Sequence, residues 1–369
     1  HLKESNESGL ITESEVGFAM LSVCENLVLP GYDQQGIKTL QRLIKDKDWE
    51  ELRESYKAEI EFGTAGIRGK RGNPNKKTDT PQDGQYLPGP NRVSIDVVRR
   101  YTLAVAKWLE HKKKKDAGVV IGRDTRIGSR RFLEESVRIL RKKGITVYYF
   151  DGDRPVAEMA LAVVEMGAAL GIEITASHLP GNWNGFKLVG KGAFPVGQKS
   201  GLKEIQQLIG KIKPSRKKGK AVKKKALQEY IKFNFEGLNL GLLKPLKVVI
   251  DTGNSVPGTL IPFLEKSLPI IKICPLFEKL DGNFPNHGTD PLVEENIASL
   301  KAEVRKRNAS FGVAFDGDGD RIIFVDEKGK RVPGDLILAL VGQNILEKCP
   351  GAKILYDVRS SNAVKEVIK

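Results

Sequence analysis

The chain has 369 residues, of which 29% are charged and 40% hydrophobic, as in soluble globular proteins and unlike disordered or fibrous chains. This length predicts two or three domains. No apolar run reaches the about 20 residues of a membrane helix, and the polar residues 1–10 do not form a signal peptide, so we expect no membrane partner. Three widely spaced cysteines favour the reducing cytoplasm over a disulfide scaffold.

The net charge of +15 is spread unevenly, because residues 211–225 hold nine basic residues and no acidic ones. Such a run can bind nucleic acid through its phosphates. We favour a solvated junction between two domains, because no aromatic residues interleave with the lysines as a base-stacking surface requires. Nucleic acid is therefore not an expected partner.

Residues 1–57 are expected to form a mostly helical lead-in, since 37–60 carries apolar residues at helical spacing. Helices and strands then alternate. The expected helices cover 94–111, 129–144 and a segment after Pro155, and the expected strands cover 118–122, 145–150 and 168–175. This rhythm predicts a mostly parallel sheet with helices on both faces.

The rhythm restarts after residues 211–225. The expected helices are 226–235, one after Pro257 and 292–307, and the expected strands are 246–251, 269–274, 311–315 and 322–326. A third unit begins near Arg331 with a helix at 334–348 and a strand at 353–358. It is too short for a complete doubly wound domain. We therefore expect a helical extension, two domains and the start of an incomplete third, over 1–57, 58–215, 216–330 and 331–369.

The stretch 315-FDGDGDR-321 places three carboxylates between glycines and between two expected strands. Glycine allows the backbone torsions that turn Asp316, Asp318 and Asp320 toward one point. Three close acids repel one another unless a cation neutralises them, and oxygen ligands suit Mg2+ or Ca2+. Arg321 directly after them suits a phosphate group. An acidic turn without a metal is the alternative.

The stretch 175-TASHLPGNWNGFK-187 follows an expected strand, at the end where open parallel sheets place ligands. Ser177 is a candidate nucleophile that needs an activating partner. His178 is adjacent, and neighbouring residues of extended chain point in opposite directions, so its role as acid–base or as a loop-fixing group stays open. Lys187 is a better acid–base candidate if burial lowers its pKa.

Two further motifs give weaker signals. In 62-FGTAGIRG-69 three glycines imply a backbone that bends around a ligand, with Arg68 as a phosphate partner. In 122-GRDTR-126 Asp124 lies between two arginines. We favour a salt bridge that fixes a loop over direct catalysis by Asp124.

Together, these motifs resemble the α-D-phosphohexomutase family. The three motifs at 62–69, 175–187 and 315–321 occur in the family's order, and 251-DTGNSVPG-258 and 284-FPNHGTDPLVEENI-297 support the match. The resemblance runs from about residue 58 to the end. It implies an α/β fold of successive mixed or parallel-sheet domains of the phosphohexomutase type, with the C-terminal part missing.

The resemblance also implies an activity. Such an enzyme is an intramolecular phosphotransferase that interconverts hexose 1-phosphate and hexose 6-phosphate through a phosphoserine and a hexose 1,6-bisphosphate. A phosphosugar would be the substrate, and neither the preferred hexose nor the oligomeric state is indicated. By resemblance Mg2+ would lie between Ser177, Asp316, Asp318 and Asp320. Ser177, Lys187, His178 and Arg68 would be catalytic, and Thr64, Arg68 and Arg321 would bind phosphate.

The chain departs from the family pattern in three places. Leu179 stands where the family usually has Asn, 286-NHGTDP-291 varies from the common form, and no Gly-Glu-x-Ser-Gly-His-like sugar loop is present. The sugar loop and the C-terminal phosphate-binding domain should lie beyond Lys369, so we expect the isolated chain to be weakly active or inactive. Two alternatives remain: a Mg2+-dependent phosphatase or phosphotransferase with an aspartate nucleophile, and a catalytically decayed binding protein.

Overall fold

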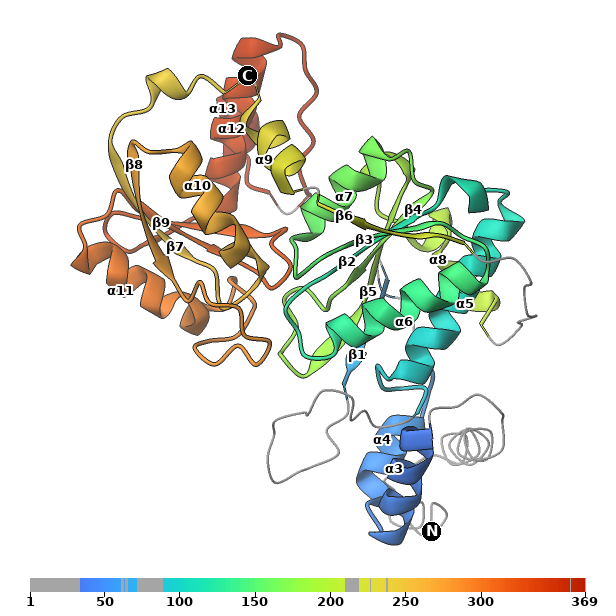
Figure 1. Ribbon diagram of the computed structural model, residues 1–369. Coiled ribbons are helices and arrows are strands. Elements are labelled where there is room, and N and C mark those ends of the chain that lie inside the picture. Colours follow the sequence, from blue (N-terminus) through green and yellow to red (C-terminus); the bar gives the residue numbers. More distant parts are fainter. Residues whose placement is uncertain are drawn as a thin grey trace.

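The computed structural model describes residues 34–60, 63, 66–71, 89–209, 219–225, 227–236, 238–358 and 360–368. These residues form two sheets with their helices, a helical hairpin on the N-terminal side, and a pair of helices on the C-terminal side (Figure 1). None of the described helices is long and apolar enough to cross a membrane.

The first sheet has the order β1-β5-β4-β2-β3-β6. Its strands are β1 (Gly66–Lys70), β2 (Val119–Arg123), β3 (Val147–Phe150), β4 (Leu170–Ile174), β5 (Trp183–Gly190) and β6 (Ala221–Lys224). The strands β4, β2, β3 and β6 run parallel to one another, and β5 is antiparallel to both β4 and β1. The predicted parallel core is present. Because β5 runs antiparallel to β4, it starts near the carboxyl end of β4 and runs back toward the residue where β4 begins.

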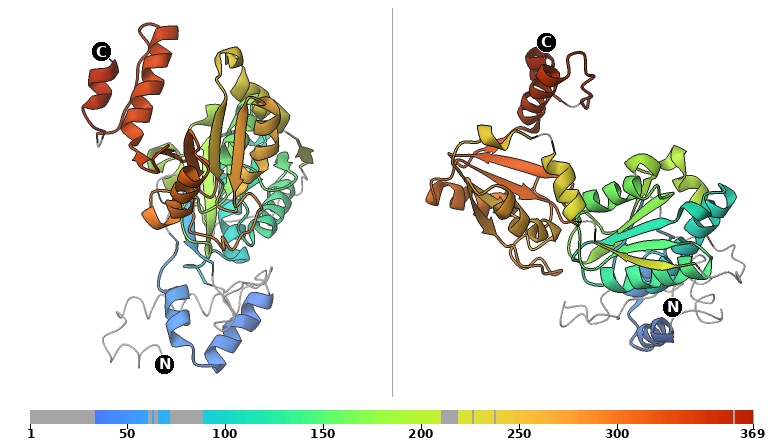
Figure 2. Two further views of the ribbon diagram at one scale, coloured as in Figure 1. Left: turned by 90° about the vertical axis from the view of Figure 1, so that its left-hand side faces the viewer. Right: turned by 45° about the horizontal axis from the view of Figure 1, so that its top comes forward.

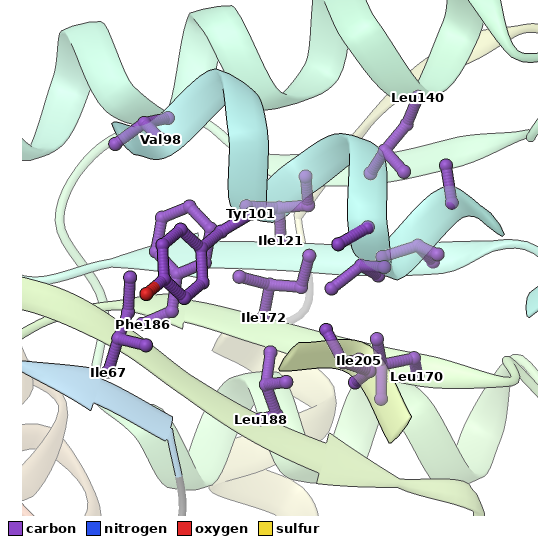
Figure 3. Packing of buried hydrophobic residues seen from close by; sticks show 14 of the residues in the cluster. Ile67, Val98, Tyr101, Ile121, Leu140, Leu170, Ile172, Phe186, Leu188 and Ile205 are labelled. Carbon is purple, nitrogen blue, oxygen red and sulfur yellow. The ribbon is translucent and has the colours of Figure 1, made fainter. Parts of the chain in front are cut away.

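Both faces of this sheet are covered by helices. On one side lie α5 (Ile95–His111), α6 (Ser129–Lys142) and α8 (Leu202–Gln207), and on the other lies α7 (Val156–Glu165). Figure 3 shows Tyr101 of α5 packing toward Phe186, with Ile121 and Ile172 beside them. Val120 points to the opposite face and packs with α7. This double burial explains the continuous apolar runs from which the strands were predicted.

The second sheet has the order β11-β10-β9-β7-β8. Its strands are β7 (Leu246–Asp251), β8 (Ile271–Leu276), β9 (Phe311–Phe315), β10 (Ile322–Asp326) and β11 (Arg331–Val332). The strands β8, β7 and β9 are parallel, whereas β10 and β11 are antiparallel. The helix α11 (Ala298–Lys306) packs on one face, and α10 (Ile261–Ser267) packs on the other.

The basic stretch 211–225 is only partly a junction. Residues 211–218 lie outside the described residues, but 221–224 form β6, the edge strand that pairs parallel to β3. For those four residues the interpretation as a solvated junction is wrong. Lysines on an edge strand keep one side of the strand hydrated and discourage pairing with another chain, which accounts for the charge. The predicted helix that follows is α9 (Leu227–Phe235).

The N-terminal segment forms two short helices, α3 (Gln34–Lys45) and α4 (Trp49–Tyr56). The chain turns at Lys47, which has a φ of 54°, and the Asp48 side chain caps α4 by accepting a hydrogen bond from Glu51 N at 3.3 Å. The hairpin is tied to the first sheet's unit by Arg92, whose Nε donates to Glu51 Oε1 at 2.8 Å. It therefore docks on the body that carries the site.

The predicted helix at 334–348 is confirmed as α12 (Gly334–Lys348), and it runs beside α13 (Ala363–Ile368). The two helices extend away from the second sheet (Figure 2). The predicted strand at 353–358 is wrong, because no described strand pairs with this segment. Leu355 and Val358 are 90% and 100% exposed there. Apolar, β-branched residues form a strand only where a neighbouring strand satisfies their backbone groups.

Candidate active site

Ser177 lies just beyond the carboxyl end of β4, at the start of the loop 176–182, which we call the serine loop. It is 1% exposed and has a φ of 55°, in the left-handed region that residues other than glycine rarely adopt. Its backbone N donates to Thr175 Oγ1 at 2.8 Å. This short turn aims the hydroxyl away from the first sheet and toward the second.

The hydroxyl of Ser177 meets the acidic loop that follows β9. Ser177 Oγ donates to Asp316 Oδ2 at 2.8 Å. Carboxylate oxygens of Asp316, Asp318 and Asp320 lie within 4.8 Å of one another. The other oxygen of Asp316 accepts hydrogen bonds from the backbone N of Asp320 and of Arg321, each at 3.1 Å. The expected convergence of serine and acids is therefore present.

The two loops can touch because residue 317 is a glycine. A Cβ at Gly317 would lie 2.5 Å from the carbonyl oxygen of Ser177, well inside van der Waals contact. Gly319 has a φ of 74°, in the left-handed region, which glycine adopts without the steric penalty that a Cβ brings. The alternation of Asp and Gly thus has two separate causes: close approach at 317 and backbone geometry at 319.

The acidic cluster suits a hard divalent cation. Asp316 and Asp318 are fully buried. Burial, followed by the charges of Asp318 and Asp320, raises the pKa of Asp316 to about 7. A protonated Asp316 can donate a hydrogen bond to Asp318. When Asp316 is ionised, the buried Oδ1 of Asp318 has no hydrogen-bond donor among the residues that the structure describes. An all-oxygen cluster with an unsatisfied buried oxygen fits Mg2+.

Lys187 lies on β5 and contacts the same cluster. Its Nζ donates to Asp318 Oδ2 at 2.7 Å and to Asp320 Oδ2 at 2.5 Å. Burial alone would lower the pKa of Lys187, but the two carboxylates outweigh it and raise the pKa above its ordinary value. The sequence analysis favoured Lys187 as an acid–base group if burial lowers its pKa, and that condition is not met in this structure. Lys187 holds its proton and also pulls the pKa of Asp318 below its usual range, against the effect of burial.

A histidine and two arginines lie near Ser177 and its acidic partner. His178 Nδ1 lies 3.4 Å from Ser177 Oγ, at the outer limit of a hydrogen bond. Burial, and then the charges of Arg321 and Arg68, lower the pKa of His178. Arg321 Nε lies 3.9 Å from Asp316 Oδ2. Positive charge is therefore available where a phosphate on Ser177 would lie. Thr64, the remaining predicted phosphate ligand, lies outside the described residues.

The motif at 122–126 forms the predicted salt bridge. Arg126 Nε donates to Asp124 Oδ2 at 3.0 Å, and both side chains are fully buried. The same guanidinium also reaches the carbonyl of Ser177. Sequence analysis singled out the aspartate and missed the arginine. The available signal was an arginine that follows a strand by only a few residues, a position that faces the ligand edge of a parallel sheet.

The fold and site define a class of α/β protein in which loops from two sheets place a serine against a carboxylate cluster. Comparison with known proteins agrees with this class. The profile of "Phosphoglucomutase/phosphomannomutase, alpha/beta/alpha domain I" matches residues 59–216, and that of "alpha/beta/alpha domain II" of the same family matches residues 226–329. The chain belongs to the phosphoglucomutase/phosphomannomutase family.

Individual relatives show the same similarity. The chain is 35% identical to a phosphomannomutase of Vibrio cholerae over 287 residues, covering 76% of this chain and 61% of the relative. It is 34% identical to the phosphomannomutase of Escherichia coli K12 over 281 residues, covering 74% and 60%. A crystal structure of a Burkholderia thailandensis phosphoglucomutase/phosphomannomutase family protein matches with a TM-score of 0.69 at 28% identity, covering 83% of this chain and 63% of that one. The chain thus spans about three fifths of the length of these relatives.

Proposed function

We propose that this chain carries the phosphoserine and metal centre of a phosphohexomutase, an enzyme that interconverts hexose 1-phosphate and hexose 6-phosphate. The observation that carries the proposal is the 2.8 Å hydrogen bond from Ser177 Oγ to Asp316 Oδ2, in a chain whose relatives are named phosphomannomutases. A buried serine hydroxyl beside a cation-binding cluster is suited to accept and donate a phosphoryl group. The low cysteine count supports a cytoplasmic location.

Phosphoryl transfer depends more on positioning and charge neutralisation than on covalent chemistry. In the proposed first step the bond between phosphorus and Ser177 Oγ breaks, and a bond to a hydroxyl oxygen of the hexose monophosphate forms. The product is a hexose 1,6-bisphosphate. After this intermediate turns over, Ser177 Oγ accepts the other phosphoryl group and the isomeric monophosphate leaves. The serine is phosphorylated at the end as at the start.

The chain's own residues have distinct tasks in this scheme. Lys187 Nζ gives its proton to Ser177 Oγ as the phosphorus bond breaks and takes one from the attacking sugar hydroxyl, and its contacts with Asp318 and Asp320 hold it at the cluster. Arg68 and Arg321 offset the phosphate charge near His178. Asp316, Asp318 and Asp320, with Ser177, would hold Mg2+. When bound, Mg2+ supplies Lewis-acid stabilisation of charge on the transferring phosphoryl group.

The test is phosphorylation of the protein by hexose 1,6-bisphosphate and MgCl2. Intact mass and peptide mapping would show one acid-stable phosphoryl group on Ser177. A labile acyl phosphate on Asp316, Asp318 or Asp320 would instead support the phosphatase or phosphotransferase alternative. A protein that gains no phosphoryl group at any residue would contradict the proposal.

A further inference from the structure

Arg126 is a buried arginine that the proposed chemistry leaves unused. Its side chain is fully buried. Placing a guanidinium in the interior costs several kcal/mol unless its donors are satisfied. Burial lowers the pKa of Arg126, and the charge of Asp124 opposes that shift. The contacts that Arg126 makes must therefore offset this cost.

Those contacts go to backbone carbonyl oxygens of the serine loop and of the first residue of β5. Nη2 donates to the carbonyl oxygens of Ser177 and Leu179, each at 2.6 Å. Nη1 donates to the carbonyl oxygens of Pro180 at 2.6 Å and of Trp183 at 3.2 Å. Arginine presents five N–H donors in one rigid plane. Four backbone carbonyls from the loop and the strand that follows it are therefore held by one side chain.

Asp124 fixes the arginine itself. Asp124 Oδ2 accepts from Arg126 Nε at 3.0 Å, and Oδ1 accepts from Arg126 N at 3.0 Å and from Ser129 Oγ at 2.9 Å. Residues 124–126 directly follow β2, the strand beside β4. The first sheet thus determines where the guanidinium lies, and the guanidinium determines where the loop carbonyls lie.

This arrangement bears on the strained serine. A non-glycine residue in the left-handed region persists only where its surroundings hold it there. Ser177 N donates to Thr175 Oγ1, and Ser177 O accepts from Arg126, so both backbone polar groups of Ser177 are fixed. With the backbone held, the hydroxyl is directed at Asp316.

Arg126 also contacts the second sheet's unit. Its guanidinium carbon lies 5.2 Å from the centroid of the Phe284 ring. Thr289 Oγ1 donates to Leu179 O at 2.9 Å, and Arg126 Nη2 lies 3.5 Å from that same hydroxyl. A Cβ at Gly282 would lie 2.4 Å from the carbonyl oxygen of Thr125, so the 281–289 segment closes tightly over this arginine.

We propose that Arg126 is a positioning residue that holds Ser177 in its left-handed conformation and couples the serine loop to the 281–289 segment. Its consequence for phosphoryl transfer rests on the proposed function. Arg126 and Thr289 both donate to the backbone carbonyl of Leu179, a contact that does not depend on the side chain at that position.

The test compares Arg126→Met and Arg126→Lys with Arg92→Met in the full chain. Arg92 is a matched control because it is also a buried arginine paired with one acid, Glu51, outside the serine loop. We expect Arg126→Met to increase amide hydrogen exchange in residues 175–183 by about 10-fold or more, with Arg92→Met leaving that segment unchanged. Lysine, a point charge without the planar fork, should protect the loop only partly.

A second readout is the rate at which hexose 1,6-bisphosphate phosphorylates Ser177. Misplacing a reacting group by about 1 Å can cost about 100-fold, so we expect a loss of that order in Arg126→Met and none in Arg92→Met. Loop exchange and phosphorylation that both match the wild type in a folded Arg126→Met protein would overturn the proposal. If wild-type protein gains no phosphoryl group while Arg126→Met still loosens the loop, the mutase proposal fails and the positioning role stands.

Thr289→Val covers the case in which Arg126→Met does not fold. It removes the hydroxyl that donates to Leu179 O and keeps the size of the side chain. We expect exchange in residues 175–183 to rise several-fold. If Thr289→Val and Arg126→Lys both exchange like the wild type, the serine loop does not depend on this arrangement, and the proposal is overturned.

Discussion

Ser177 Oγ and Asp316 Oδ2 are 2.8 Å apart although 139 positions separate the two residues in sequence. Each residue follows the carboxyl end of a central strand, β4 in the first sheet and β9 in the second. The site is therefore shared between two separately built cores. A shift of one sheet against the other changes the environment of the serine hydroxyl. Substitutions in either loop can therefore test the site.

The first prediction concerns the serine hydroxyl. Ser177→Ala removes the phosphoryl acceptor, so phosphorylation by hexose 1,6-bisphosphate should be abolished. The loss of one hydrogen bond to Asp316 should change the free energy of unfolding by only about 1 kcal/mol. Intact mass and urea unfolding measure the two effects. Ser136→Ala is the matched control, because this buried serine on α6 is hydrogen-bonded to Thr102 on α5 at 3.1 Å, outside the site. A phosphoryl group that still arrives at the normal rate in Ser177→Ala would contradict the assigned nucleophile.

The second prediction concerns the cation. A ligand at 100 times its dissociation constant stabilises a fold by about 3 kcal/mol, so saturating Mg2+ should raise the melting temperature and EDTA should reverse the rise. Asp320→Asn should weaken this response, because the cluster loses one charge at its exposed edge. Glu327→Gln removes an exposed carboxylate a few residues away and should leave the response intact. An equal Mg2+ response in both variants would show that the cation binds elsewhere.

The third prediction concerns the close approach of the two loops. Gly317→Ala places a methyl group 2.5 Å from Ser177 O and 3.3 Å from Arg126 Nη2, so the loops must separate. Overpacking of this kind costs about 1–3 kcal/mol, and phosphorylation of Ser177 should fall with it. Gly334→Ala is the matched control, because no atom lies within 4 Å of a Cβ at that position. Gly317→Ala with wild-type stability and wild-type phosphorylation would mean that the loops do not need this contact.

Much of this site could be predicted from the sequence, because its motifs are local. The alternation of Asp316, Asp318 and Asp320 with glycine is visible in seven residues, and it requires a turn that gathers the acids. The position of Ser177 beyond a buried strand followed from the apolar run before it. Short-range patterns therefore located both halves of the site, and the expectation that they meet came from the family resemblance.

What the sequence could not supply depends on residues far apart in the chain. The raised pKa of Lys187 arises from Asp318 and Asp320, more than 130 positions away, and burial alone pointed the other way. The contacts of Arg126 with four carbonyls depend on how the serine loop folds back. The segment 353–358 has the composition of a strand, but pairing partners decide whether a strand forms.

The last prediction concerns Glu158, a fully buried acid on α7. Neither carboxylate oxygen has a hydrogen-bond partner among the described residues. Arg154 Nε lies 3.9 Å from Glu158 Oε1. Burial raises the pKa of Glu158 from 4.5 to about 7, Arg154 opposes that shift, and the charge of Glu229 adds to it. Glu173 and Tyr230 also interact electrostatically with this carboxyl.

Because the folded-state pKa is raised, Glu158 favours the folded state fully below pH 4.5, and this contribution is lost as the pH rises through about 7. Glu158→Gln removes that loss, so the variant should gain about 3 kcal/mol on the wild type between pH 4.5 and pH 8. Urea unfolding at both pH values measures this difference, in which groups that titrate alike in both proteins cancel. Glu134→Gln, an exposed acid paired with Arg130, should produce no such divergence. Parallel stability curves for Glu158→Gln and the wild type would mean that the buried carboxyl keeps an ordinary pKa, which would require a polar partner beside it in solution.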